Sequence, residues 1–172
     1  MHDRFVSILM GSESDLSLVK YTVDILKSFE IKTEVKIASA HRTPDLLAEY
    51  IEDAQKRGVM VFICAAGLAA HLAGAVAART VRPVIGIPVD GGPLNGVDAL
   101  YSTVQMPGGI PVATVAIGRA GAKNAAYLAA QIMALTDPVV EAKVLLDREN
   151  AKTAVIKKND TLDQYFNDKP AP

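Results

Sequence analysis

The stretch from Lys32 to Gln55 decides the fold of this chain, and it reads KTEVKIASAHRTPDLLAEYIEDAQ. Lys32 to Ala38 alternates between apolar and polar residues, as a β-strand does. Asp45 to Gln55 carries its apolar residues at helical spacing. Ser39 to Pro44 is therefore predicted to be a strand-to-helix turn that holds a histidine, an arginine and two hydroxyl side chains. Open α/β sheets hold their ligands at such turns.

The same alternation of strand and helix continues along the chain. Further strands are expected at 5–10, 59–66, 83–89 and 111–117. Further helices are expected from residue 15 onward and at 69–79, 98–104, 122–135 and 138–150. This order predicts an α/β fold with a parallel sheet covered by helices on both faces. We expect a three-layer, flavodoxin-like, doubly wound sheet of five strands in the order 2-1-3-4-5.

In that strand order, the crevice for a ligand opens between the first and third strands. Gly11 to Asp15 follows the first strand and Ala66 to His71 follows the third. The second strand lies beside the first, so the Ser39 to Pro44 turn is expected next to them. Three segments that are distant in sequence should therefore share one crevice.

Composition limits what the chain can be. Its 172 residues fit one domain, which we place at residues 1–152, with 153–172 as a polar extension or tail. The net charge of −1 argues against a dominant affinity for nucleic acid or for an anionic membrane. No apolar stretch has the length of a membrane span, and no signal peptide is visible. The single cysteine, Cys64, predicts a reducing, cytoplasmic location.

Gly11 to Asp15 opens a helix, where backbone N–H groups and the helix dipole favour an anion. Ser12 and Ser14 add hydroxyl donors, and the Asp15 carboxylate is able to accept two hydrogen bonds from a ribose diol. Ser14 also fits a helix N-cap and Asp15 a first-turn acid. This segment alone does not separate a ligand site from a helix start.

In the second turn, a cation lies beside hydroxyl groups. Arg42 could pair with phosphate oxygens while Ser39 and Thr43 donate hydrogen bonds. His41 is a candidate acid or base, because histidine exchanges protons near neutral pH. Thr43 before Pro44 also fits an ordinary helix start. Arg42 on the surface and His41 without a role are alternatives that the sequence leaves open.

The third turn combines small residues with a second histidine. Around Gly67, small side chains let a planar ligand approach the backbone, and His71 is expected in the first turn of the following helix. A packed helix with an incidental histidine fits equally well. Gly118 to Asn124 lacks the spacing of a phosphate loop, and no Gly-x-Gly-x-x-Gly follows the first strand. Three histidines and one cysteine give no convincing metal site, so neither a metal nor a cofactor is expected.

Five segments together resemble a known family, the PurE-type N5-carboxyaminoimidazole ribonucleotide mutases of purine biosynthesis. In the family's order and spacing, they are Met10–Asp15, Ser39–Pro44, Ala69–Leu72, Val104–Pro107 and Ala116–Ala122. The resemblance covers roughly residues 5 to 150. It departs at Leu68, where the family often has a second glycine. That leucine adds a side chain beside the expected carboxylate pocket.

The resemblance implies a flavodoxin-like homo-octamer that converts N5-carboxyaminoimidazole ribonucleotide into 4-carboxy-5-aminoimidazole ribonucleotide. It implies that Ser14, Ser39 and Arg42 hold the 5′-phosphate. By the same resemblance, Asp15 holds the ribose hydroxyls and Ser12 contributes to the nucleotide site. His41 is implied as the acid/base, with His71 and Gly67 near the base and carboxylate. Gln105 to Pro107 are implied to line or complete the pocket, across subunits.

Two other functions remain open on the sequence. One is direct carboxylation of aminoimidazole ribonucleotide by carbon dioxide, for which the same histidine chemistry would serve. The other is a non-enzymatic flavodoxin-like module that binds flavin or a partner protein. The few backbone donors in the first loop and the lack of Trp argue against flavin.

Overall fold

The computed structural model describes residues 4–162 and residue 166. It contains one parallel sheet in the order β2-β1-β3-β4-β5. The strands are β1 (Phe5–Met10), β2 (Thr33–Ile37), β3 (Val59–Ala66), β4 (Val84–Pro88) and β5 (Ala113–Thr114). The α/β class, the parallel pairing and the order 2-1-3-4-5 predicted from the sequence are confirmed.

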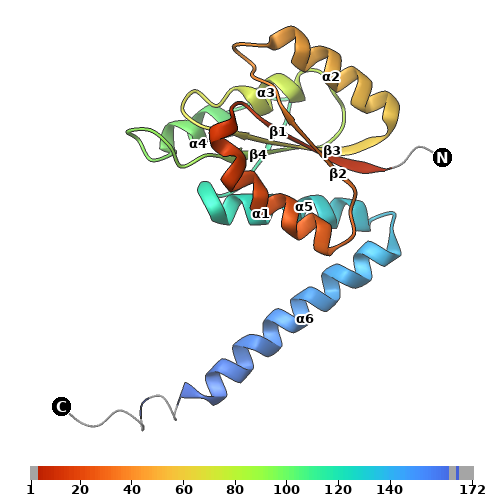
Figure 1. Ribbon diagram of the computed structural model, residues 1–172, viewed down its shortest axis with the longest axis vertical. Coiled ribbons are helices and arrows are strands. Elements are labelled where there is room, and N and C mark those ends of the chain that lie inside the picture. Colours follow the sequence, from red (N-terminus) through yellow and green to blue (C-terminus); the bar gives the residue numbers. More distant parts are fainter. Residues whose placement is uncertain (1–3, 163–165, 167–172) are drawn as a thin grey trace.

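Helices cover both faces of this sheet (Figure 1). One face carries α1 (Leu16–Ser28) and α5 (Gly118–Ala134), which pack against each other. The other face carries α2 (Pro44–Arg57), α3 (Leu72–Ala77) and α4 (Val97–Val104). The short 3₁₀ turn η1 (Glu13–Asp15) joins β1 to α1. The result is the expected three-layer arrangement.

The two central strands form the core because both of their faces are covered. All six residues of β1 are buried, and so are six of the eight residues of β3, since helices lie above and below them. Continuous apolar runs are typical of such strands. The edge strand β2 instead alternates, because it is only partly covered. The carboxyl ends of β1, β2 and β3 consequently form a fixed rim for the turns that follow.

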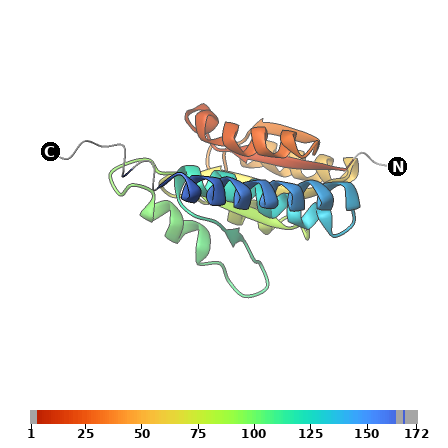
Figure 2. The ribbon, with the colours of Figure 1, turned by 90° about the horizontal axis from the view of Figure 1, so that it is seen from below.

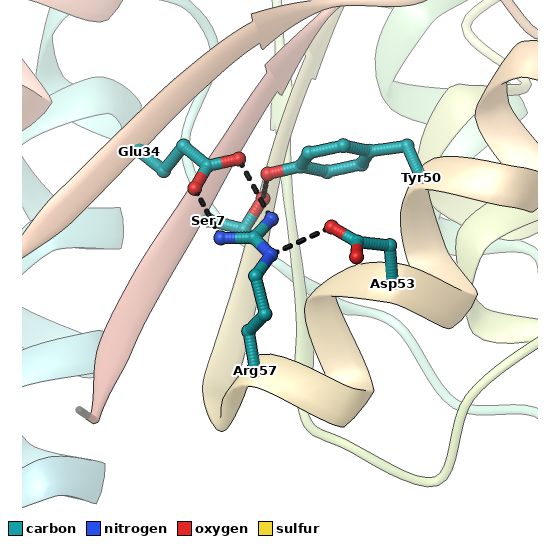
Figure 3. Close-up of polar contacts among 5 residues, drawn as sticks. All are labelled: Ser7, Glu34, Tyr50, Asp53 and Arg57. Atoms are coloured by element: carbon teal, nitrogen blue, oxygen red, sulfur yellow. Dashed lines mark hydrogen bonds and ion pairs between the residues drawn. The ribbon is translucent and has the colours of Figure 1, made fainter. Parts of the chain in front are cut away.

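Helix α2, which follows the Ser39–Pro44 turn, is held to the sheet by a polar cluster as well as by apolar packing (Figure 3). The Tyr50 hydroxyl lies 2.8 Å from the Ser7 hydroxyl of β1, and both are buried. Arg57 donates two hydrogen bonds to Glu34 of β2, at 2.6 and 3.0 Å, and a third to Asp53. These bonds lower the pKa of the Glu34 carboxyl. The middle and the C-terminal end of α2 are thereby fixed relative to both strands.

Some element boundaries differ from the prediction. β5 is two residues long instead of the seven expected at 111–117, and it pairs only with β4. Helix α3 begins at Leu72 rather than at residue 69, so His71 is its N-cap and not part of its first turn. Helix α5 begins at Gly118, four residues before the predicted start. These differences do not change the strand order.

Helix α6 (Pro138–Asp160) runs ten residues beyond the predicted end at Asn150. The chain has no glycine or proline from Val139 to Lys169, so nothing in the sequence stops the helix there. Its first part packs on α5 through Val140 and Val144, and its later part runs away from the sheet (Figure 1). Seen from below, α6 lies in front of α5 (Figure 2). Of the predicted extension 153–172, residues 163–165 and 167–172 lie outside the described part. In the described residues, no helix is both long and apolar enough to cross a membrane.

Candidate active site

A cavity of about 620 Å³ lies at the carboxyl end of the sheet, where the turns after β1, β2, β3 and β4 meet. The eight residues predicted to be catalytic or substrate-binding line it, which are Ser12, Ser14, Asp15, Ser39, His41, Arg42, Gly67 and His71, whereas Thr43 and Gln105–Pro107 do not. We call Ser12, Ser14, Asp15, Ser39 and Arg42 the polar half. We call the opposite lining, Ala66–Ala69 with Val89, Gly91 and Gly92, the apolar half.

The Ser39–Pro44 turn is shaped by its own hydroxyl groups. The Ser39 hydroxyl accepts hydrogen bonds from the backbone N–H of His41 at 3.3 Å and of Arg42 at 3.1 Å. The Thr43 hydroxyl accepts one from the backbone N–H of Ser39 at 2.9 Å, and Pro44 begins α2. Thr43 therefore starts the helix and also closes the turn. The turn fixes the backbone at His41 and Arg42, and so the origin of both side chains.

Arg42 connects the two turns of the polar half. Its Nη2 donates a 2.7 Å hydrogen bond to the backbone carbonyl of Gly11, at the end of β1. A guanidinium has five N–H donors in a planar fork, so one such bond leaves donors for an anion. The side chain is thus aimed across the polar half of the cavity rather than along the surface.

The Gly11–Asp15 segment differs in detail from a simple N-cap at Ser14. Ser12 is the capping residue, because its hydroxyl accepts a 3.4 Å hydrogen bond from the Ser14 backbone N–H. The Ser14 hydroxyl instead donates to the Asp15 carboxylate at 3.2 Å. Burial raises the pKa of the Asp15 carboxyl, and the hydrogen bond from Ser14 opposes that rise. A polar ligand that donates hydrogen bonds to this carboxylate replaces the water lost on burial and stabilises the charged form.

Two imidazole rings stand between the halves. His41 Nε2 lies 2.8 Å from His71 Nδ1, and the ring planes are close to perpendicular at 80°. His41 comes from the turn after β2 and His71 from the turn after β3, so the pair crosses over the end of β1. One nitrogen of this contact donates and the other accepts, which holds the His41 ring in one orientation. An oriented imidazole is suited to general acid and base chemistry.

The apolar half contains residues that the sequence reasoning did not select. Val89, Gly91 and Gly92 follow β4 and face Gly67 and Leu68 across the cavity. A Cβ built on Gly67 would lie 3.4 Å from the Val89 Cβ, so the two turns are in close contact. The glycine-rich loop after β4 was the available signal, because ligands bind outside the carboxyl ends of parallel strands.

The remaining quoted motifs do not line this cavity. Met106 lies against α3, where its Sδ would be 3.1 Å from a Cβ on Gly74. Gly121 is required by packing, because a Cβ there would be 1.6 Å from the Ala116 carbonyl oxygen. Cys64 is a core residue, and burial raises the pKa of its thiol. Among the side chains that the structure describes, no cluster of three metal-ligating groups occurs.

Comparisons with known proteins agree on one family. The profile described as AIR carboxylase matches residues 5–154. The N5-carboxyaminoimidazole ribonucleotide mutase of Bacillus subtilis is 52% identical over 157 residues, which cover 91% of this chain and 97% of that protein. The N5-carboxyaminoimidazole ribonucleotide mutase of Thermotoga maritima is 50% identical over 169 residues, which cover 95% of this chain and 98% of that protein. A crystal structure of Treponema denticola PurE superposes with a TM-score of 0.84 at 31% identity, covering 92% of this chain and 98% of that one.

Proposed function

The chain belongs to the AIR carboxylase family, and from this premise we propose that it is an N5-carboxyaminoimidazole ribonucleotide mutase of purine biosynthesis. The enzyme is an isomerase that moves a carboxylate from the exocyclic nitrogen to C4, giving 4-carboxy-5-aminoimidazole ribonucleotide. The observation that carries the proposal is the cavity itself. In it, an oriented imidazole stands between a polar half suited to a ribose phosphate and an apolar half suited to a heterocycle.

In the polar half, each group matches one part of a ribonucleotide. Arg42 and the hydroxyls of Ser14 and Ser39 hold the 5′-phosphate, since a guanidinium fork matches phosphate oxygens. The start of the α1 segment adds backbone donors at Ser12. Asp15 accepts hydrogen bonds from the two ribose hydroxyls, and these bonds replace those to the water that burial removes. These roles leave the imidazole ring of the substrate near His41, His71 and Gly67.

The reaction balances with one proton relay. The bond from the exocyclic nitrogen to the carboxylate breaks, its electron pair stays on nitrogen, and His41 supplies a proton there. The carbon dioxide released is attacked by C4, which is nucleophilic because the amino group feeds electrons into the ring. C4 then loses its proton to His41, so the histidine returns to its starting state. No oxidant, nucleotide triphosphate or added carboxylate enters this balance.

His71 orients His41 in this scheme. The 2.8 Å contact between the rings fixes which edge of His41 faces the cavity. A fixed ring reaches both the exocyclic nitrogen and C4 with a small movement, because that nitrogen is bonded to the ring carbon next to C4. Catalysis then comes mainly from positioning and from excluding water.

The assembly and location are also proposals. We infer a homo-octamer in which Gln105 to Pro107 of one subunit complete the cavity of another. Exposed apolar residues on the described surface support contacts between copies, among them Tyr101, Val104, Leu145 and Leu146. We place the catalytic domain at residues 1–152, with 153–172 as an extension. A cytoplasmic location fits the single buried thiol of Cys64.

Isotope transfer tests the function directly. Substrate labelled with ¹³C in the carbamate is incubated with the purified protein in unlabelled bicarbonate, without ATP or added metal. We expect the label in the C4 carboxylate of the product. A protein that leaves the substrate unchanged beyond its spontaneous decay would contradict the proposal.

The second candidate is direct carboxylation, favoured by the family's description as AIR carboxylase. It is distinguished by supplying aminoimidazole ribonucleotide at low bicarbonate. A mutase should turn over the carbamate rapidly and this substrate slowly. The reverse preference would assign the chain to direct carboxylation. A non-enzymatic flavin-binding module would instead purify with a yellow chromophore.

A further inference from the structure

Leu68 has a backbone conformation that leucine rarely adopts. Its φ is 56°, in the left-handed region, and it lies in the turn between β3 and α3. Among the described residues, Glu30 and Asn95 are the other non-glycine residues with positive φ, and neither lines the cavity. Strained backbone persists where the surrounding structure holds it, and such places are often ligand sites.

The side chain of Leu68 crosses to the neighbouring turn. A Cβ built on Gly92 would lie 2.4 Å from Leu68 Cδ2, so the leucine fills the space that a side chain at position 92 would need. Gly92 itself has a φ of 71°. The turns after β3 and β4 are therefore in contact where the Leu68 side chain packs against Gly92. Leu68 and Gly92 both line the cavity, so this contact joins the two turns within its apolar half.

Folding alone gives little reason for a leucine here. The residue remains 53% exposed, so it contributes little to the core. Glycine would adopt the same φ without strain. A half-exposed apolar side chain held in a strained backbone at the lip of a cavity is better explained by what the cavity contains.

We propose that Leu68 is a positioning residue that seals the apolar half around the carbon dioxide released from the substrate. This inference rests on the proposed function. Carbon dioxide is uncharged and has no proton to donate, so polar groups retain it weakly, and in this chain, where the family often has glycine, the Leu68 side chain supplies an apolar wall that confines it. If it escapes before C4 attacks, the nitrogen keeps its proton and aminoimidazole ribonucleotide leaves as a by-product. Leu68 thus controls the partition between transfer and loss.

The test measures that partition in the complete protein. Carbamate-labelled substrate is given to wild type, Leu68→Gly and Leu68→Ala in unlabelled bicarbonate, and spontaneous decay is subtracted. We expect the ratio of aminoimidazole ribonucleotide to product to rise about ten-fold or more in Leu68→Gly, with a smaller rise in Leu68→Ala. Substrate affinity should stay within about two-fold, because the polar half is intact. Thermal unfolding shows that each variant is folded.

Two further variants separate sealing from mere disturbance of the loop. Leu68→Met keeps the apolar volume and should keep the wild-type partition. Leu94→Ala removes another exposed leucine of the loop after β4 that does not line the cavity, and it should also leave the partition unchanged. A Leu68→Met protein that leaks as much as Leu68→Gly would contradict the sealing role.

A double-mutant cycle tests the contact with Gly92. Gly92→Ala should displace the leucine and cause leakage, whereas in a Leu68→Gly background only its backbone strain at positive φ remains, so it should add little further leakage while thermal unfolding reports the strain. If Leu68→Gly retains the label as wild type does, the inference is overturned while the mutase function stands. If wild type itself transfers no carboxylate, the proposed function fails first, and the two failures are therefore distinguishable.

Discussion

The two halves of the cavity are built in different ways. The polar half comes from the turns after β1 and β2, and hydrogen bonds such as those from His41 and Arg42 N–H to the Ser39 hydroxyl hold its shape. The apolar half comes from the turns after β3 and β4, and close contacts hold it, as between Gly67 and Val89. The comparison suggests that the polar half determines affinity and the apolar half determines the fate of the carboxylate. His41 and His71 stand at the boundary.

The largest effect is expected at that boundary. His41→Asn removes the proton relay but keeps a polar side chain of similar reach. Turnover should fall about 100-fold or more, while nucleotide binding stays near the wild-type level. Steady-state rates combined with calorimetric binding of the product would separate the two quantities. Near-normal turnover in this variant would remove His41 from the mechanism.

The accuracy of the predictions made from the sequence differs between strands and turns. β1 and β3 were predicted at their observed boundaries, because a strand buried on both faces requires a continuous apolar run. β5 was predicted too long, because none of residues 111–117 is buried and the pairing with β4 is limited to Ala113–Thr114 and one hydrogen bond from the Val115 N–H to the Gly86 carbonyl. The end of α6 was missed because a polar composition was taken as a tail, although no residue there breaks a helix.

For the site, residue chemistry was readable and contacts between turns were not. Arg42, His41 and Asp15 could be selected because a cation, an imidazole and a carboxylate suit a ligand at the ends of strands, although an ordinary structural role for each remained open on the sequence. The contact of Leu68 with Gly92 joins residues 24 positions apart on two loops, and no periodicity signals it. The hydroxyl of Ser39 was assigned to a ligand, and in the structure it also shapes its own turn.

The next largest effect is expected within the polar half. Arg42→Ala should weaken substrate binding by about 2 kcal/mol or more, roughly 30-fold in KM, because the phosphate loses its charged partner. Label retention among completed turnovers should not change, since the apolar half is untouched. Arg42→Lys keeps the positive charge without the planar fork of donors, so its KM should lie between those of wild type and Arg42→Ala.

A matched control for Arg42 is Arg79→Ala. Arg79 lies after α3 and does not line the cavity, so KM should remain at the wild-type value. If Arg42→Ala binds substrate as well as this control does, the phosphate role is wrong. If Arg42→Ala instead loses carbon dioxide, the assignment of affinity to the polar half and of carboxylate retention to the apolar half is wrong.

A smaller effect, with opposite signs in two measurements, is expected at Asp15. Asp15→Asn should raise KM by about ten-fold, because a hydrogen bond to a charged acceptor is lost. The same change should stabilise the free protein at neutral pH. Burial raises the pKa of this carboxyl in the folded state, so keeping it ionised costs folding free energy at neutral pH.

The pH dependence checks the sign of that argument. With a raised folded pKa, the penalty is absent below the unfolded value of about 4 and develops as pH rises through the folded pKa. The stability gap between Asp15→Asn and wild type should therefore open between acid and neutral pH in denaturant titrations. A gap that closes over the same range would mean that the carboxylate is stabilised rather than strained.

The smallest effect on activity is expected outside the cavity, at the contact that attaches α2 to β1. Tyr50→Phe removes the 2.8 Å contact with the Ser7 hydroxyl and leaves that group buried without its partner. The free energy of unfolding should fall by about 1–3 kcal/mol, with turnover unchanged. Burial raises the pKa of Tyr50 to about 12, so this difference should be constant below about pH 10 and shrink only as pH approaches 12.

The double variant Ser7→Ala with Tyr50→Phe sharpens this last test. Removing both hydroxyls leaves no unpaired polar group, so much of the lost stability should return. If KM rises in the single variant and recovers in the double one, the anchor of α2 sets the position of the Ser39–Pro44 turn. A single variant that changed label retention instead would show that the two halves are mechanically coupled, because no residue of the apolar half contacts Ser7 or Tyr50 through a hydrogen bond in the described chain.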